Sequence, residues 1–314
     1  MSDKSMPCTN YFQIIGEVIY ASIDSIAQSR HISYESAHKE VLRYLVSNSA
    51  QWNSGRQPII KYEDPLCRIA YLYGIVSVNA NLIEFIFRKD QELSDFIDQT
   101  HADNGQINIC AFGGGPGTEL LGIAKWLEKR ELGYPVVLDF LILDQIKEWL
   151  ESWQSIQRKM EFRYKNYYGI DRANWPINVS KGFCPFDITS TESFGNLGDV
   201  FGQDLYILSY VVSEIFDFAP DLRRTVAKMV EKAPPGSKFL FVERREDRWV
   251  REIVSLSEEA GISISPMKKT STSMDTDEEK RDLGQIYFDV KNILGRSYDP
   301  RITWKAFWTV GTKD

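Results

Sequence analysis

The stretch Ile107-Asn108-Ile109-Cys110-Ala111-Phe112-Gly113-Gly114-Gly115-Pro116-Gly117-Thr118-Glu119-Leu120 decides the fold of this chain. An apolar run breaks into glycines and then restarts with helical spacing. A strand that ends in glycines and passes at once into a helix lets a ligand approach bare backbone, with the helix N–H groups pointing at it. The stretch therefore predicts a site for a nucleoside-like cofactor.

The glycine spacing separates this site from two common nucleotide motifs. The dinucleotide fingerprint requires Gly-x-Gly-x-x-Gly, whereas Gly113, Gly115 and Gly117 give Gly-x-Gly-x-Gly, with Gly114 as an extra glycine. A P-loop requires a lysine before Ser or Thr, and Thr118 follows Gly117 directly. The stretch resembles motif I of the class I S-adenosylmethionine-dependent methyltransferases. The alternative interpretation is a strand-to-helix turn that binds no ligand.

Composition limits the possible classes of protein. A chain of 314 residues is long enough for one large α/β domain with an appendage or for two small domains. With 43% hydrophobic and 26% charged residues, it has the composition of an ordinary globular protein. The net charge of −7 and pI near 5.2 argue against a strongly nucleic-acid-seeking surface, although a local basic patch stays open.

Cysteine and histidine positions predict neither disulfides nor a metal site. The four cysteines are too scattered for a C-x-x-C metal site and too few for a disulfide framework, so we expect reduced thiols. His31, His38 and His101 show no metal or triad spacing. No basic and apolar leader and no run of about 18 apolar residues is evident in the sequence. We therefore expect a cytoplasmic protein with no membrane partner, and a nuclear location stays open.

Residues 1–104 are predicted to form a helical region. Apolar spacing indicates one helix over 11–26, a second that begins after an N-cap at Ser33, and a longer apolar segment over 66–87. The polar loop 99–106 is the expected boundary. This region is interpreted either as a cap that covers the cofactor pocket and forms the acceptor site or as a purely structural layer.

Strands and helices alternate over the second predicted domain, 105–314. Strands are expected at 107–112, 136–143, 178–183, 204–210 and 238–243, and helices at 117–131, 145–160, 220–232 and 247–260. The pattern predicts an α/β, Rossmann-like, doubly wound and mostly parallel seven-stranded sheet. Residues 286–313 are expected to supply a final hairpin, and 267–281 a polar mobile loop that is either a solvated connection or a substrate lid.

Asp144 is the predicted ribose ligand. It ends the apolar strand Leu141-Ile142-Leu143, where a carboxylate can accept protons from two vicinal hydroxyls at the mouth of the sheet. Gln145 follows it and is included in the expected cofactor site. The alternative interpretation is that Asp144 caps the helix that begins at Gln145.

The resemblance to class I methyltransferases extends over four segments in residues 107–243. It implies that Asp187 accepts a hydrogen bond from the adenine amine, that Phe186 covers the ring and that Ser209 contacts the cofactor. Asp187 could instead cap the turn that begins at Thr189. The family commonly has an acid two residues before the first glycine, but here that residue is Ala111. Either another group such as Glu119 binds the cofactor's ammonium, or cofactor affinity is lower.

The segment after the fourth strand, Ser209-Tyr210-Val211-Val212-Ser213-Glu214, faces the acceptor in this family. It lacks the Asn/Asp-Pro-Pro-aromatic motif of methyltransferases that act on the amino groups of bases or glutamine. Glu214 and Tyr210 are the candidate catalytic residues, because a base assists removal of an acceptor proton. Their alternative roles are a carboxylate at a helix start and a packed tyrosine.

One further stretch bears on the acceptor. Aromatic and basic residues alternate over 149–175, a pattern that suits single-stranded nucleic acid or a planar acceptor, but also an ordinary amphipathic helix.

Together these features predict an S-adenosylmethionine-dependent methyltransferase that acts on an O or N acceptor. The acidic balance favours a small molecule over RNA. The alternative is a non-catalytic protein of the same fold that serves as a cofactor sensor or protein-interaction module. Neither the acceptor nor the oligomeric state follows from the sequence.

Overall fold

A computed structural model describes ten stretches of the chain: 11–52, 59–130, 136–168, 177–180, 182–190, 192–193, 201–215, 219–273, 283–294 and 299–313. Within them one sheet is built from β1 (Ile107–Phe112), β2 (Val136–Asp144), β3 (Ile177–Ser180), β4 (Phe183–Pro185), β5 (Leu205–Ser209), β6 (Lys238–Arg244), β7 (Ile262–Ile264), β8 (Lys268–Ser273) and β9 (Thr303–Lys313).

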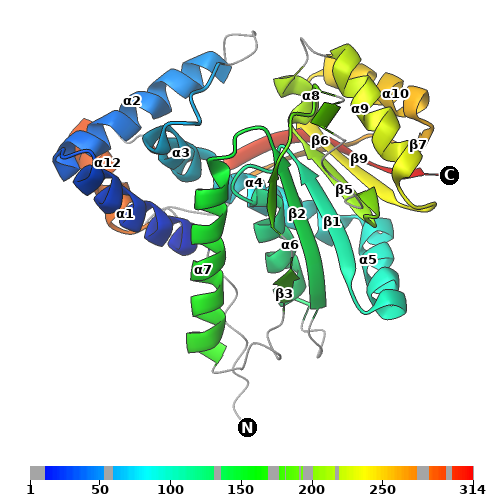
Figure 1. Cartoon of the computed structure of the whole chain (residues 1–314), viewed down its shortest axis with the longest axis horizontal. Helices are drawn as coiled ribbons and strands as arrows, with labels where there is room; N and C mark the ends of the chain where they lie inside the picture. Colours follow the sequence, from blue (N-terminus) through cyan, green and yellow to red (C-terminus); the bar gives the residue numbers. More distant parts are fainter. Residues whose placement is uncertain are drawn as a thin grey trace.

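The strand order is that of a doubly wound sheet (Figure 1). Seven strands follow the path β3-β2-β1-β5-β6-β9-β7, while β4 pairs with β2 and β8 with β9. The pairs from β3 to β6 are parallel, and β9 runs antiparallel to β6, β7 and β8. This confirms the predicted mostly parallel Rossmann-like sheet, with β4 and β8 added to the seven-strand path.

The order of strands places a ligand crevice at the ends of β1 and β5. From β1 the chain moves outward to β2 and β3, then returns to β5 on the other side of β1 and continues to β6. The carboxyl ends of β1 and β5 therefore meet at the topological switch point, where open α/β sheets bind ligands.

Helices cover both faces of the sheet (Figure 1). The helices are α1 (Tyr11–Ser29), α2 (Tyr34–Trp52), α3 (Pro65–Tyr71), α4 (Ser77–Lys89), α5 (Gln91–Asn104), α6 (Thr118–Glu128), α7 (Trp149–Tyr168), α8 (Val211–Glu214), α9 (Ala219–Lys232), α10 (Asp247–Ala260) and α12 (Gln285–Leu294). Residues of α4, α6 and α7 share a core with one face, and residues of α9 and α10 share a core with the other.

Strand β1 shows why two cores form. Ile107, Ile109 and Ala111 belong to the core beneath α4 and α6, whereas Cys110 and Phe112 belong to the core beneath α9 and α10. Successive side chains in a strand point to opposite faces, so a strand covered on both faces is apolar at nearly every position. Asn108, partly buried near the start of β1, is the exception, and it bonds to Asp204.

The N-terminal region forms helices, as its periodicity predicts. The Ser33 hydroxyl accepts a hydrogen bond from the Ser36 backbone N–H at 3.1 Å, which confirms the predicted N-cap. The apolar segment becomes one long helix, with a π-helical turn at Leu72–Val76 joining α3 to α4. This helix, Pro65–Lys89, is long and apolar enough to cross a membrane, but most of it is buried inside the protein, as expected of a core helix.

The predicted boundary between residues 104 and 105 cuts through a continuous core. One cluster of buried residues extends from Phe12 in α1 to Val310 in β9. In addition, α12 joins α1 and α2 at the end of the molecule away from α9 and α10 (Figure 1). The expected polar loop 99–106 is wrong for most of its length, because α5 continues to Asn104 and ends at Gly105 in the left-handed conformation (φ 70°).

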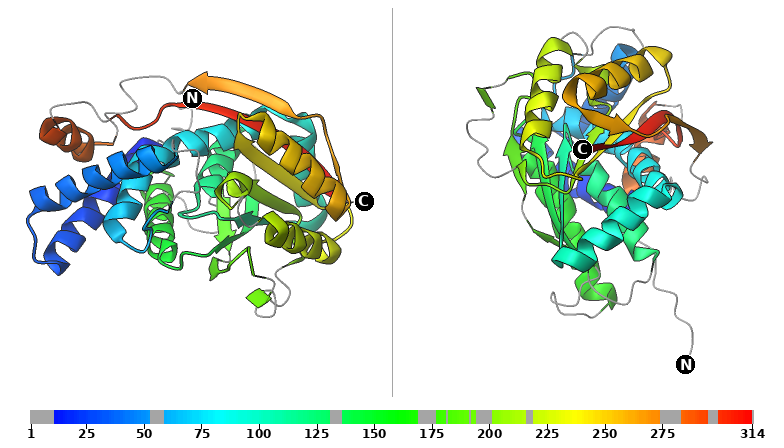
Figure 2. Two further views of the ribbon diagram at one scale, coloured as in Figure 1. Left: turned by 90° about the horizontal axis from the view of Figure 1, so that it is seen from above. Right: turned by 90° about the vertical axis from the view of Figure 1, so that its right-hand side faces the viewer.

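Two predictions for the C-terminal third are corrected. Residues 285–294 form a helix and 303–313 one long strand between β6 and β7, so the expected hairpin within 286–313 is wrong. Lys268–Ser273, expected to be mobile, pairs with β9 as β8 (Figure 2, left). Threonines and serines in that segment suit an edge strand with one solvated face. Residues 274–281 of the expected loop lie outside the described residues.

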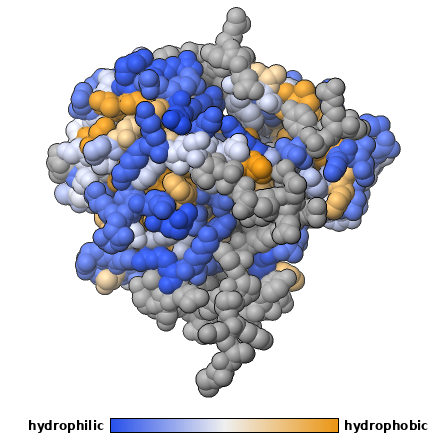
Figure 3. Space-filling view, turned by 180° about the vertical axis from the view of Figure 1, so that it is seen from behind, coloured by the Kyte–Doolittle hydropathy of each residue, from blue (hydrophilic) through white to orange (hydrophobic). Residues whose placement is uncertain are grey.

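The aromatic and basic stretch 149–175 is in part an ordinary core helix. Trp149 and Trp153 of α7 are 3% and 1% exposed, and Arg163 pairs with Glu17 of α1 at 3.0 Å. Side chains from 164 to 175 lie outside the description. On the face seen in Figure 3, hydrophobic side chains show only in small separate groups, because most apolar residues contribute to the cores.

Candidate functional site

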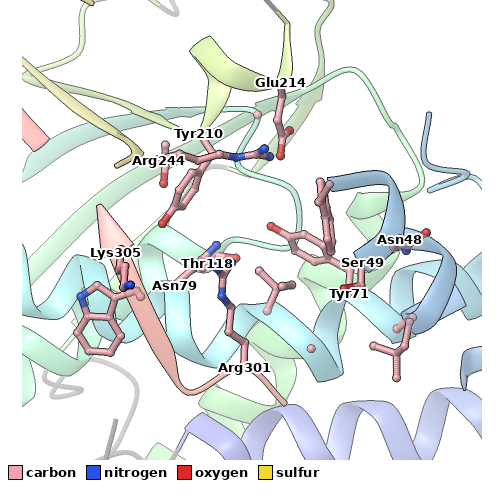
Figure 4. Close-up of a pocket in the computed structure, with 18 of the residues that line it drawn as sticks. Asn48, Ser49, Tyr71, Asn79, Thr118, Tyr210, Glu214, Arg244, Arg301 and Lys305 are labelled. Atoms are coloured by element: carbon pink, nitrogen blue, oxygen red, sulfur yellow. The ribbon is translucent and has the colours of Figure 1, made fainter. Parts of the chain in front are cut away.

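A cavity of about 630 Å³ opens at the switch point of the sheet. Its inner end is formed by the glycine turn, through Gly113, Gly114, Thr118 and Glu119. Tyr210 and Glu214 form one wall, and Asn48, Ser49 and Tyr71 of the helical region form the opposite one (Figure 4). The helical region therefore covers the predicted cofactor turn.

The glycine turn needs backbone angles that other residues avoid. Gly113, Gly115 and Gly117 have φ values of 60°, 48° and 84°. A β-carbon on Gly117 would lie 2.4 Å from the Trp153 ring, so this position is restricted by both conformation and space. The turn is fixed further by the Gly113 N–H, which donates to the Leu143 carbonyl at 2.8 Å.

Asp144 lies beside this turn and bonds to its backbone. One carboxylate oxygen accepts from the Gly115 N–H at 2.9 Å, and the other accepts from the Ile146 N–H at 2.8 Å. The Ile146 bond is a cap-like contact, but α7 begins at Trp149 and not at Gln145. A carboxylate has about four lone-pair positions, so both oxygens can still accept a hydroxyl. Burial raises the pKa of Asp144 to about 6, and Gln145 beside it is exposed.

Phe186 and Asp187 lie away from the cavity, at the end of β4. Phe186 is 3% exposed and packs edge-on against Phe112 with ring centroids 5.8 Å apart. Asp187 accepts hydrogen bonds from the Thr189 backbone N–H at 2.8 Å and the Thr189 hydroxyl at 2.6 Å. The capping role considered for Asp187 is thus present, and its contact with adenine stays a prediction.

Tyr210 adopts a strained backbone conformation at the end of β5. Its φ of 62° is unusual for a bulky residue, and such strain persists only where surrounding structure enforces it. The Tyr210 N–H donates to the Val242 carbonyl at 2.8 Å. This turn directs Ser209, Tyr210 and Glu214 into the cavity. Burial raises the pKa of Glu214 to about 7, and the pKa of Tyr210 is also raised by burial.

Glu243 holds the turn after β5 in place and was not predicted from sequence. It is fully buried at the end of β6, and its carboxylate accepts from the Ser213 N–H at 2.9 Å and from the Arg244 N–H at 2.7 Å. An acid in the strand Phe239-Leu240-Phe241-Val242-Glu243 was the available signal, because a buried carboxylate needs partners.

Glu119 is a buried acid at the inner end of the cavity. It is 5% exposed, and within the described residues its Oε2 atom has no hydrogen-bond partner. The neighbouring Thr118 hydroxyl is likewise buried without a partner there. Burial raises the pKa of Glu119 to about 8, and the charges of Asp144 and Glu214 add to this. An unpaired buried acid of this kind is suited to a cationic ligand.

The structure also explains the missing acid at Ala111. Its side chain is fully buried, and a β-carbon on Gly114 would lie 3.0 Å from the Ala111 β-carbon. A carboxylate at 111 would have no space beside this turn. The buried acid nearest in sequence is Glu119, eight residues later, in the first turn of α6.

The helical region contributes residues that sequence reasoning missed. The π-helical turn carries Gly74, whose carbonyl accepts from the Arg301 N–H at 3.0 Å, and it places Tyr71 and Ile75 on the cavity wall. Tyr71 packs against Trp149 with ring centroids 5.4 Å apart, so the helical region and α7 meet over the glycine turn. Glycine in a long apolar helix was the only hint, since π turns are frequent at functional sites.

No metal centre is evident in the described residues, where no group of three or more His, Cys, Asp or Glu side chains could hold an ion.

The comparisons with known proteins concern the fold. No family model matches the sequence, and no curated protein matches it. Solved structures do match: an O-methyltransferase family protein from Burkholderia thailandensis is 13% identical (88% of this chain, 72% of that chain, TM-score 0.43). A SAM-dependent methyltransferase from Methanosarcina mazei is 11% identical (66% and 92%, TM-score 0.40).

A putative methyltransferase from Bacillus halodurans is 13% identical (70% of this chain, 99% of that chain, TM-score 0.37). The strand order of this chain is by itself that of a doubly wound, Rossmann-like sheet. At these identities the likeness concerns the fold alone, and TM-scores below 0.5 add nothing about the acceptor or the site residues.

Proposed function

We propose that this protein is an S-adenosylmethionine-dependent methyltransferase. The observation that carries the proposal is the pairing of a left-handed glycine turn with an unpaired buried acid, Glu119, at the switch point of a doubly wound sheet. Bare backbone suits a nucleoside, and the acid suits the ammonium of the cofactor's methionine end. These two features together fit this cofactor better than they fit a nucleotide phosphate, which a buried acid would repel.

Each part of the cofactor has a candidate partner in the site. Gly113 and Gly115 let it approach the backbone, Glu119 and Thr118 hold its methionine end, and Asp144 holds its ribose. Adenine recognition by Phe186 and Asp187 belongs to the same proposal. When bound, the cofactor supplies a methyl group on a sulfonium, which is already strongly electrophilic.

The protein's task is then to align the acceptor and to remove its proton. Glu214 and Tyr210 face the cavity from the wall opposite the helical region (Figure 4). With a pKa of about 7, the Glu214 carboxylate is partly ionised near neutral pH and is still basic enough to accept a proton. The helical wall excludes water, so that an O–H or N–H acceptor can be held in line with the methyl group.

Calorimetric titration of the full chain tests the proposal. We expect saturable one-to-one binding of S-adenosylmethionine and S-adenosylhomocysteine. Absence of binding for both would refute the proposed function. A second assay follows labelled methyl from S-adenosylmethionine in the presence of a mixture of candidate acceptors. If the wild-type protein binds the cofactor but transfers no label to any acceptor or to water, the non-catalytic sensor would be supported instead.

A further inference from the structure

We propose that the methyl acceptor is a small planar molecule that carries a carboxylate or phosphate, and that Arg244, Arg301 and Lys305 bind this anionic group. This inference rests on the proposed function, because it assigns the second ligand of the same cavity. The inference is based on the charged side chains that line the cavity and on the aromatic rings in its walls.

The cavity is lined by four cations that form no ion pair with any carboxylate of the described residues. Arg244 ends β6 and Arg245 follows it, while Arg301 and Lys305 lie at the start of β9. Across the described residues, the nitrogens of these four side chains have no carboxylate within 4.0 Å. Other arginines are paired, such as Arg68 with Glu151 at 2.8 Å and Arg223 with Glu252 at 2.6 Å. Converging unpaired cations attract an anion.

Within the described residues, the acids of the cavity form no ion pair with these cations, although the charge of Arg244 acts on Glu214 and lowers its pKa somewhat. Glu246 pairs with Arg248 at 2.8 Å, and Asp299 has a partner of its own. Glu119 lies at the inner end, beside the glycine turn, where the cofactor's ammonium is placed. Glu214 stands between the two ends, with Arg244 extending toward it (Figure 4). The cavity therefore combines a buried acid beside the glycine turn with four cations that form no ion pair within the described residues.

Aromatic side chains define the shape of the acceptor. Four aromatic side chains line the cavity: Trp52, Tyr71, Tyr210 and Trp304. Figure 4 shows Tyr71 and Tyr210 on opposite sides of the gap, with Arg301 extending between them. Facing rings favour a planar body. A cavity of about 630 Å³ lies within the range of small-molecule sites, which favours a small acceptor over a polymer.

A set of probes with one ring and different charges tests this inference. Benzoate, phenyl phosphate, neutral benzamide and cationic benzylamine are titrated into the full chain saturated with S-adenosylhomocysteine, and binding is measured by ligand-observed NMR. We expect benzoate and phenyl phosphate to bind and benzylamine not to bind. Comparison of benzoate with phenyl phosphate distinguishes a carboxylate acceptor from a phosphorylated one.

Variants locate the binding. Arg301→Gln is expected to weaken benzoate and phenyl phosphate about tenfold, the loss of one charge-assisted hydrogen bond. Arg244→Gln is the second variant, in case one loop change perturbs the fold. The control is Arg251→Gln, an exposed arginine of α10 outside the cavity, which is expected to bind as wild type does.

Several results would overturn the inference: benzylamine binding as tightly as benzoate, no anionic probe binding at millimolar concentration, or unchanged binding in both arginine variants. A short single-stranded RNA that displaces benzoate and depends on Arg301 would overturn the small-molecule assignment. The S-adenosylhomocysteine titration is interpreted separately. If S-adenosylhomocysteine does not bind, the proposed function is refuted. If it binds and no anionic probe does, only the proposed class of acceptor is refuted.

Discussion

At the scale of single residues, the site depends on acids that are buried next to one another. Glu119, Asp144 and Glu214 all have raised pKa values, chiefly because burial disfavours the charged carboxylate. Such a cluster disfavours ionisation in the free protein and favours a cationic ligand.

Glu119→Gln tests the assignment of the cofactor's ammonium. We expect it to weaken S-adenosylhomocysteine binding at least about tenfold, because a charge-assisted hydrogen bond is lost. Near neutral pH, wild type should also release a proton on binding, since the ammonium stabilises the ionised Glu119, whose free pKa is about 8. Calorimetry in buffers of different ionisation enthalpy measures this proton. Glu258→Gln, on exposed α10 surface, is the control. If the Glu119→Gln variant released as many protons on binding as wild type does, the assignment of Glu119 would be contradicted.

The same acids predict how stability depends on pH. Their folded pKa values of about 6, 7 and 8 lie above the unfolded values of 3.8 and 4.5, so the folded state binds more protons in that interval. The free energy of unfolding should therefore fall as pH rises from about 5 to about 8. Urea titrations across this range measure the effect, and Glu119→Gln should reduce the slope at its upper end. A stability that rises steadily to pH 8 would refute these shifts.

At the scale of elements, the glycine turn is positioned by helix α7. Gly117 combines a φ of 84° with a close approach to Trp153, and Gly236 has a similar φ of 82° but open space around it. Gly236→Ala should cost about 1–2 kcal/mol of stability, for the left-handed backbone alone. Gly117→Ala should cost about 2–4 kcal/mol, because overpacking against Trp153 adds to it. Urea unfolding compares the two, and equal losses would argue against the packing seen at the turn.

The elements also show what sequence could predict. Strand β1 lies at 107–112, as its apolar run indicates, because a strand buried on both faces leaves a clear signal. Strand β8 was missed, since Lys268–Ser273 is polar and becomes a strand only by pairing with β9. The tail was misread for the same reason, because β9 pairs with β6, β7 and β8, which all come much earlier in the sequence.

The candidate site also contains residues that the sequence predicts and residues that it does not. The glycine turn and Asp144 follow local patterns, and a hydrogen bond from the Gly115 N–H joins them at the carboxyl ends of β1 and β2. Arg301, Asn79 and Tyr71 reach the cavity only through tertiary packing, so no spacing in the sequence indicates them. The capping of Thr189 by Asp187 and the burial of Phe186 also depend on neighbours that a local pattern does not contain.

At the scale of the whole molecule, the helical region and the sheet share one core. Buried residues from α1 to β9 form a single cluster, and Arg68 of α3 bonds to Glu151 of α7 at 2.8 Å. We therefore expect one cooperative unfolding transition, with coincident urea curves by circular dichroism and tryptophan fluorescence. An intermediate that keeps the sheet but has lost the helical region, seen as proteolysis confined to residues before 105, would contradict this.

The central claim is that the glycine turn and Glu119 bind the methionine and adenosine parts of one cofactor. A crystal structure of the full chain with S-adenosylhomocysteine tests it most directly. We predict the ligand amine within hydrogen-bond distance of Glu119 and the ribose hydroxyls on Asp144. A ligand bound elsewhere, an amine held by another group, or a cavity that stays empty at saturating ligand would contradict the claim.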